Sequence, residues 1–331
     1  MRRTVGSLLG ACLLTACSSG PTAGTASPSA QASHAASAPA CRAGGRPPLR
    51  FGAAIAYDAA RKTIVLFSGI RGDGSAPLAD TWTWDGCQWA SHNLSTTPPG
   101  RSFGAMAYDP GHSNVVLFGG GSANSDNARN DTWIWDGQGW SERHPTSAPP
   151  LMSGADLAYD KTAGAIVLVG QSLRGESTVT WTWDGRAWAS KQPAHAPGPR
   201  ADPALAPGAN SLLYFGGTSP FGDRLSDLWS WNGSDWSQVQ LKPGPAGGPA
   251  RMARDDARAS VVLLEEDGTW TLKGLDWTHQ QPQTVPPYEA FRALAYDAAT
   301  QKVIGFGGQS SPSQRGTDET WAWDGASWTA R

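Results

Sequence analysis

The sequence is poor in charged residues and in long apolar runs. Charged side chains make up 16% of the 331 residues, against about 25% in an average soluble domain, so long charged helices are not expected. The 26 Lys and Arg against 28 Asp and Glu leave a formal net charge of −2, which argues against a nucleic-acid partner bound through overall basicity. The longest apolar run, residues 5–16, is shorter than the ~20 residues of a membrane-spanning helix, so no transmembrane helix is expected.

Motifs for catalysis and metal binding are also missing. The sequence contains no G-x-S-x-G, no H-E-x-x-H and no phosphate-binding loop, and no two of its six His residues have the spacing of metal ligands. No catalytic residue, metal site or cofactor is therefore predicted. An enzyme could still arise from carboxylates that distant loops bring together, as in a carbohydrate-active lyase, epimerase or hydrolase. The candidates for such a pair are Asp126, Glu176, Asp223 and Glu266.

The amino terminus has the pattern of an export signal. Met1-Arg2-Arg3 is a positive n-region, an apolar stretch follows it, and residues 14–17 read Leu-Thr-Ala-Cys. These four residues resemble the lipobox of bacterial lipoproteins. The resemblance implies that residues 1–16 are a signal peptide and that Cys17 is acylated, so that membrane lipid is a partner and the protein is held on the cell membrane, facing outside the cytoplasm. The alternative is an ordinary cleaved signal peptide with a chance Cys.

Residues 17–48 are expected to form the lipidated Cys and a flexible tether. This segment consists mainly of Ala, Ser, Pro, Thr and Gly, so it cannot bury enough apolar surface to offset the loss of chain entropy. Of the four Cys residues, Cys12 leaves with the signal and Cys17 is acylated. Cys41 and Cys87 remain, and export makes them candidates for a disulfide, with two free thiols as the alternative.

Six copies of one Trp-containing phrase dominate the rest of the chain. The phrase is D-x-W-x-W-D-G-x-x-W, and all 17 Trp residues fall on its three Trp positions, with Leu272 in the remaining place. Two strand-like segments precede each phrase, as at residues 50–58 and 63–67. The unit therefore predicts four antiparallel strands, named a to d, with a tight hairpin between c and d. Trp84 and Trp89 are expected to meet across the first of these hairpins.

Six repeats of a four-stranded unit are typical of a β-propeller. The chain resembles the kelch family and the wider galactose-oxidase-like propellers in its Gly doublets at 119–120, 216–217 and 307–308, in the aromatic-Asp pair that ends strand a, and in the aromatic residues of strands c and d. The resemblance implies an all-β, six-bladed propeller over residues 49–331 and leaves the function open. The blades are expected at about residues 50–91, 101–142, 152–190, 200–238, 248–279 and 289–331.

Acidic residues next to the Trp phrases are interpreted as structural. A repeated Asp precedes the first Trp of the phrase and is expected to fix its loop through backbone N–H groups rather than to bind calcium; the copies are Asp80, Asp131, Asp227 and Asp318. The fifth repeat departs most from the pattern, because residues 265–268, Glu-Glu-Asp-Gly, join strands b and c directly. This blade is either a degenerate repeat or the position of a special site. Its acidic turn is a candidate cation site, with a solvated hairpin as the alternative.

Strand direction sorts the loops onto two faces. The short a–b and c–d turns lie on one face, called the turn face, and the variable b–c loops and d–a connections lie on the other, called the loop face. Ligand binding is expected on the loop face. Arginines at or near the start of strand a are candidates to surround the channel mouth and to bind carboxylates or sugar acids; they are Arg50, Arg101, Arg200, Arg251 and Arg292. The alternative is that each Arg bonds within its own blade.

Together these features favour a membrane-anchored, extracytoplasmic binding or interaction module that holds a glycan or a cell-surface protein on its loop face. The alternative is an exported carbohydrate-active enzyme with carboxylates on the same face. A third hypothesis is a structural part of a larger envelope complex.

Overall fold

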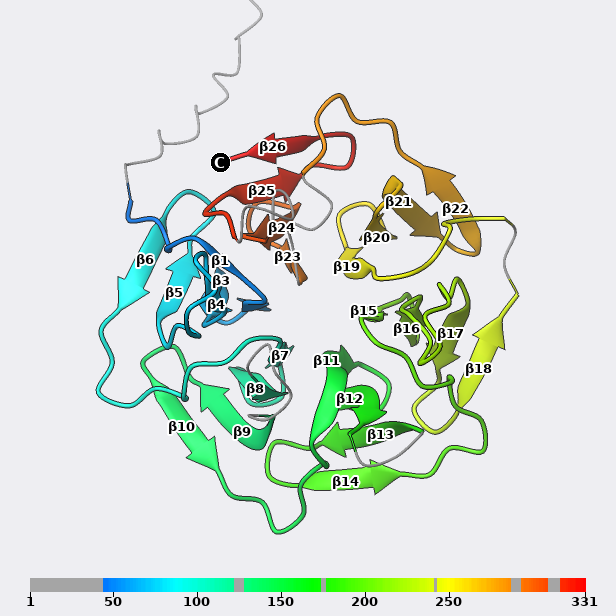
Figure 1. The fold of residues 1–331 in the computed structure, drawn as a ribbon, viewed down its shortest axis with the longest axis horizontal. Coiled ribbons are helices and arrows are strands. Elements are labelled where there is room, and N and C mark those ends of the chain that lie inside the picture. The colour runs from blue at the N-terminus through cyan, green and yellow to red at the C-terminus, as the bar shows by residue number, and fades with distance from the viewer. Residues whose placement is uncertain (1–43, 122–127, 174–176, 241–242, 287–292, 309–315) are drawn as a thin grey trace, which may run out of the picture. The chain divides into compact units, whose positions relative to one another are not determined.

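The computed structural model describes residues 44–121, 128–173, 177–240, 243–286, 293–308 and 316–331. The regular structure of these residues is all β, in six four-stranded antiparallel sheets arranged around a central axis (Figure 1). The predicted fold class, a six-bladed β-propeller, is confirmed. No helix in these ranges is long and apolar enough to cross a membrane.

Each blade is built from one continuous stretch of chain, with strand a nearest the axis and strand d outermost (Figure 1). Blade 1 contains β2 (Ala54–Asp58), β3 (Thr63–Phe67), β5 (Thr81–Trp84) and β6 (Trp89–His92). Blade 2 contains β7 (Ala105–Asp109), β8 (Asn114–Gly120), β9 (Arg129–Trp135) and β10 (Trp140–Arg143). Blade 3 contains β11 (Met152–Asp160), β12 (Ala165–Ser172), β13 (Thr178–Trp183) and β14 (Trp188–Lys191).

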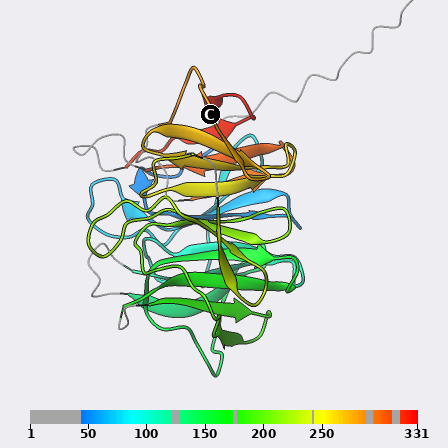
Figure 2. The same cartoon turned by 90° about the vertical axis from the view of Figure 1, so that its right-hand side faces the viewer.

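The second half of the ring repeats this order. Blade 4 contains β15 (Ala204–Pro207), β16 (Leu212–Phe215), β17 (Leu228–Trp231) and β18 (Trp236–Val239). Blade 5 contains β19 (Arg251–Asp255), β20 (Ser260–Glu265), β21 (Gly268–Lys273) and β22 (Asp276–His279). Blade 6 contains β23 (Leu294–Asp297), β24 (Lys302–Phe306), β25 (Thr320–Trp323) and β26 (Trp328–Ala330). A further two-stranded sheet pairs β1 (Arg50–Phe51) with β4 (Ile70–Arg71). Figure 2 shows the ring from the side.

Blades 1 and 6 meet without exchanging a strand, because each sheet consists of consecutive segments. The backbone N–H of Arg50 donates to the Thr317 carbonyl at 3.1 Å, and the N–H of Gly308 donates to the Arg50 carbonyl at 2.9 Å. These bonds fasten the start of the first blade to the b–c region of the last. The ring is thus closed by backbone and side-chain contacts between whole blades.

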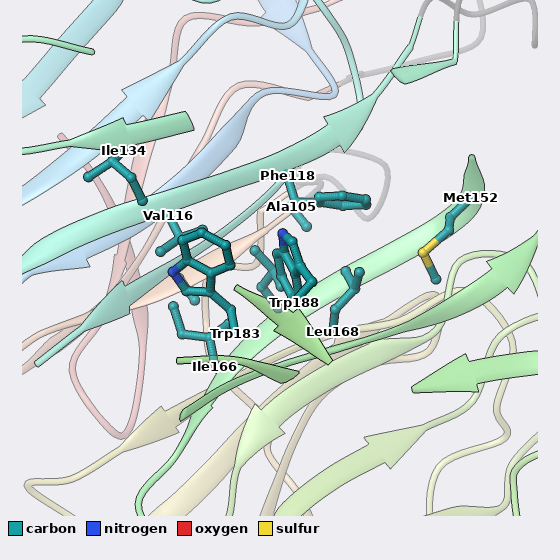
Figure 3. Close-up of a cluster of buried hydrophobic side chains, with 11 residues drawn as sticks. Ala105, Val116, Phe118, Ile134, Met152, Ile166, Leu168, Trp183 and Trp188 are labelled. Carbon is teal, nitrogen blue, oxygen red and sulfur yellow. The ribbon is translucent and has the colours of Figure 1, made fainter. Parts of the chain in front are cut away.

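Paired tryptophans fill the spaces between blades. Trp84 lies opposite Trp89 across the β5–β6 hairpin, with ring centroids 5.5 Å apart and planes inclined by 47°, which confirms the predicted contact. Figure 3 shows the equivalent pair, Trp183 and Trp188 of blade 3, against Val116 and other residues of blade 2. Because the inclined rings interlock with apolar side chains of the adjacent sheet, the seams that contain such a Trp pair are closely packed apolar layers.

A hydrogen bond marks five of the six seams. The Nε1–H of the strand-d Trp donates to the Oγ1 of a strand-c Thr in the preceding blade at 2.8–2.9 Å; the pairs are Trp89–Thr320, Trp140–Thr81, Trp188–Thr132, Trp236–Thr180 and Trp328–Thr269. At the seam between blades 4 and 5 the corresponding strand-c residue is Leu228. The buried Nε1 of Trp277 has no hydrogen-bond partner among the described residues.

Candidate functional site

Three of the arginines expected around the channel mouth are buried inside their own blades. Arg50, Arg101 and Arg200 have exposed fractions of 0–2%. Arg101 makes a bidentate pair with Asp131, with Nη1–Oδ1 at 2.6 Å and Nη2–Oδ2 at 2.8 Å. It also donates to the Gly119 carbonyl at 2.9 Å. Trp133 Nε1 donates to the same carboxylate at 2.8 Å.

This Arg–Asp–Trp cluster is called the clamp, and it recurs in blades 1 and 4. Arg50 pairs with Asp80 and Arg200 pairs with Asp227, both with Nη1–Oδ1 distances of 2.7 Å. Burial alone would raise the pKa of these Asp carboxyls, but the hydrogen bonds and charge of the Arg outweigh it and lower the pKa. The clamp fits the alternative in which each Arg bonds within its blade, rather than a ligand-binding ring. It also assigns the repeated Asp of these three blades to an Arg instead of to backbone N–H groups, whereas Asp318 of blade 6 lies 3.9 Å from Arg46.

The other two arginines have different positions. Arg251 lies in β19, is half-buried, lines the central cavity and donates through Nη1 to the Ala250 carbonyl. Arg292 is outside the described residues. A signal for the clamp was present in the sequence, because Arg and Asp are 30 residues apart in blades 1 and 2 and 27 apart in blade 4.

The six innermost strands enclose a cavity of about 360 Å³. One layer of its wall is Ala in every blade: Ala56, Ala107, Ala158, Ala206, Ala253 and Ala295. Toward the turn face the next residue is Tyr in four blades: Tyr57, Tyr108, Tyr159 and Tyr296. The wall is therefore mainly apolar and aromatic, as is usual for small-molecule pockets.

Two charged side chains stand close to the Ala layer on its loop-face side, and the other charged residues along the cavity are Lys161, Arg254 and Asp256. Asp156 in β11 and Arg251 in β19 stand two residues before the Ala layer, where blades 1, 2, 4 and 6 have Ala. Both are half-buried. Asp156 Oδ2 accepts the backbone N–H of Leu205, on the adjacent strand β15, at 3.1 Å. The cavity thus has one acidic and one basic group in the same layer.

The carboxylates proposed for an enzyme do not line the central cavity where the structure describes them. Asp126 and Glu176 lie outside the described residues. Asp223 accepts a hydrogen bond from Ser219 Oγ at 3.0 Å, and Glu266 forms an ion pair with Arg224. Neither of these two lines the cavity.

No group of three or more His, Cys, Asp or Glu in the described ranges is arranged to hold a metal ion. The cation site considered for the acidic turn at residues 265–267 is therefore not supported.

The loop face carries most of the exposed large apolar residues of the described structure. Leu49, Leu173 and Val285 are 42–51% exposed, and Phe221 is 92% exposed. Leu275, at 58%, lies on the turn face. Phe221 therefore differs from the others in that almost the whole ring faces solvent.

Hydrogen bonds fix the turn that carries Phe221. The Ser219 N–H donates to the Asp223 carbonyl at 2.8 Å, and the Gly222 N–H donates to the Ser219 carbonyl at 2.9 Å. Ser219 Oγ accepts the N–H of Asp223 at 3.0 Å and that of Phe221 at 3.2 Å. Residues 219–223 therefore hold the aromatic ring outward on a preorganised turn.

The predicted cysteine chemistry lies mostly outside the described residues. This applies to Cys17 and Cys41. Cys87 is in the c–d turn of blade 1, where its N–H donates to Asp85 Oδ1 at 2.9 Å. Gly45 forms a β-bridge with Trp89, and a Cβ on Gly44 would lie 2.6 Å from the Cβ of Gln88. The described start of the chain thus runs beside this turn, and the Cys41–Cys87 disulfide stays a prediction.

Of three comparisons with known proteins, only the comparison with solved structures found a similar protein. No protein-family model matches the chain, and no curated protein matches it. A solved structure named "Structure of YjhT" is similar, with a TM-score of 0.64 and 13% sequence identity, over 86% of this chain and 98% of that chain. At this identity the likeness supports the six-bladed propeller fold alone.

Proposed function

We propose that the protein is a kelch-like binding module, anchored to the outside of the cell membrane, which holds a glycan or a cell-surface protein on its loop face. The observation that carries the proposal is the 92% exposure of Phe221 on a turn fixed by its own hydrogen bonds. Burying such a side chain in a complex contributes about 1.5–3 kcal/mol. Because the turn is already ordered, little of this free energy is lost in fixing the loop on binding.

The membrane anchor is proposed from the amino-terminal sequence. Export, cleavage after residue 16 and acylation of Cys17 follow from the lipobox-like residues, and the Ala-, Ser- and Pro-rich tether would carry the propeller away from the lipid surface. We expect the mature protein to partition into detergent and the Cys17→Ser variant to stay in the aqueous phase. A Cys17→Ser variant that remained in the membrane fraction would contradict the anchor.

Binding on the loop face can be tested with two matched variants. Phe221→Ser removes the exposed ring on the loop face, whereas Leu275→Ser removes an apolar side chain that is 58% exposed on the turn face. Wild type and both variants would be screened on a glycan array and by pull-down with envelope proteins, and each ligand would be confirmed by titration. We expect a ligand whose affinity falls at least tenfold with Phe221→Ser and is unchanged with Leu275→Ser. No ligand, or equal binding by all three proteins, would overturn the proposal.

A further inference from the structure

The seam between blades 4 and 5 lacks contacts that other seams have. It lacks the Trp–Thr bond, because Leu228 takes the place of the accepting Thr and packs in the same apolar cluster as Trp277. On the turn face, a side chain of one blade lies within 4 Å of the place of a Cβ on the c–d turn Gly of the next at the five other seams; the pairs are Arg61–Gly137, His112–Gly185, Asp160–Gly233, Arg258–Gly325 and Thr300–Gly86. At Gly274, the corresponding residue of blade 5, no described atom lies within 4 Å of the place of a Cβ. No side chain of blade 4 therefore covers the c–d turn of blade 5 at Gly274.

Blade 5 also lacks its own clamp arginine. At two other seams the N–H of a b–c Gly donates to the carbonyl of the next clamp Arg: Gly69 to Arg101 and Gly308 to Arg50, each at 2.9 Å. At the blade 4–5 seam the same bond runs from Gly217 to Gly248 at 2.7 Å. Gly248 therefore occupies the position of the clamp Arg.

A guanidinium from blade 4 fills the space that this substitution leaves. A Cβ on Gly248 would lie 2.8 Å from Arg224 Nε. Arg224 Nε and Nη2 donate to the Gly247 carbonyl at 2.9 and 2.6 Å, and Nη1 pairs with Glu266 of blade 5. Arg224 thus bonds to a backbone carbonyl and a carboxylate across the seam, as Arg101 does within blade 2. Its side chain is 43% exposed, whereas that of Arg101 is 1% exposed.

The same backbone segment is held on its other side by a buried carboxyl group. Glu265 Oε2 accepts the Gly247 N–H at 3.1 Å, while Oε1 is buried and has no hydrogen-bond partner in the described part of the chain. Burial, followed by the adjacent Asp267 carboxyl, raises the pKa of Glu265 to about 8. The other charged or titratable groups described around this site are Glu266, Arg224 and His279, whose Nε2 bonds to the Asp267 carbonyl at 3.1 Å. A proton on Glu265 removes the repulsion between its carboxyl group and that of Asp267.

The turn that exposes Phe221 ends at this contact. Thr218 and Arg224 form a β-bridge at the base of the turn, and Phe221 is at its tip. We propose that Arg224 and Glu265 form a pH-sensitive latch on the blade 4–5 seam, in which ionisation of Glu265 releases Gly247 and changes how the turn presents Phe221. This inference rests on the proposed function only in assigning Phe221 to ligand binding. The latch would then regulate that site.

Ionisation releases the latch for a simple electrostatic reason. Glu265 has an exposed fraction of 1%, so its ionisation places a negative charge in a buried position beside the exposed carboxyl group of Asp267. An ion is stabilised far better in water than in such a site. The turn face of the seam has no side chain over Gly274 to resist a small separation. The side chain therefore moves toward solvent, and the Gly247 N–H loses its acceptor.

The latch can be tested with fluorine NMR on the purified full chain. The chain has eight Phe residues, so uniform labelling with 4-fluorophenylalanine gives few signals, and Phe221→Leu assigns the one from Phe221. Between about pH 6 and pH 9.5 this signal should shift with a midpoint near the pKa of Glu265. In Glu265→Gln it should stay at the low-pH position. In Arg224→Ala it should lie near the high-pH position throughout.

Arg61→Ala is the matched control, because it removes an inter-blade guanidinium on the turn face, where Arg61 Nη1 donates to the Ser113 carbonyl at 2.9 Å. It should titrate as wild type does. A wild-type signal that does not move, or an equal shift in Glu265→Gln, would overturn the latch. No ligand is needed for this measurement, so its failure would leave the binding proposal standing. If the binding screen found no ligand but the Phe221 signal titrated as expected, the binding proposal would be overturned and the latch would stand.

Discussion

Replacement of Arg101 by Ala should be among the most destabilising single changes in the propeller. Arg101 is 1% exposed, and the change removes its bidentate pair with Asp131 and its bond to the Gly119 carbonyl. The Asp131 carboxylate, 18% exposed, would keep the bond from Trp133 but lose its counter-charge. Removing one partner of a buried ion pair costs about 3–5 kcal/mol. For a domain of this size that corresponds to a fall in melting temperature of about 6–20 °C.

The assay is equilibrium unfolding in urea, with Arg224→Ala as the comparison. Arg224 makes a similar set of bonds but is 43% exposed, so its replacement should cost no more than about 1 kcal/mol. Hydrogen bonding to Arg101 lowers the pKa of Asp131 despite its burial. The stabilisation is therefore present above the ordinary pKa of Asp and is lost as the pH falls through the folded-state value. Equal losses for the two variants, or a loss for Arg101→Ala that does not shrink in acid, would refute the account of the clamp.

Three further changes test other parts of the ring. Thr132→Val keeps the shape of the side chain but leaves the Trp188 Nε1–H unpaired in a buried seam, so calorimetry should show a loss of about 1–3 kcal/mol. Gly137→Ala and Gly164→Ala both place a Cβ at positive φ, but only at position 137 does it meet another side chain, at 1.7 Å; urea unfolding should therefore show a larger loss for Gly137→Ala. Because the pKa of Glu265 is raised to about 8, the free energy of unfolding should fall as the pH rises from the ordinary Glu pKa to that value, and this slope should be shallower in Glu265→Gln.

The strands and their pairing could be predicted because the tryptophans specify both. In each of the five regular hairpins the second Trp of the phrase lies opposite the strand-d Trp, as Trp135 does Trp140. A shift of one residue would turn these rings to the other face of the sheet, so the register has no close competitor. The seam bonds were not predicted, because the Thr that accepts each Trp N–H belongs to a different repeat. Thr81 and Trp140, for example, are 59 residues apart.

The partners of the charged residues were harder to predict, because a charged side chain on the loop face can bind a ligand or form an ion pair within its own blade. The deciding quantity is burial, and burial of Arg50 depends on how the loop before Asp80 folds over it. The short turn of blade 5 illustrates the same limit. The sequence shows only that the b–c loop is missing there, which fits both a degenerate blade and a special one. The difference depends on Arg224, which belongs to the preceding repeat and reaches Glu266 across 42 residues. A comparison of repeats one by one cannot detect a group that one blade supplies to the next. The sequence of blade 5, the weakest repeat, can therefore be interpreted only together with the sequence of blade 4.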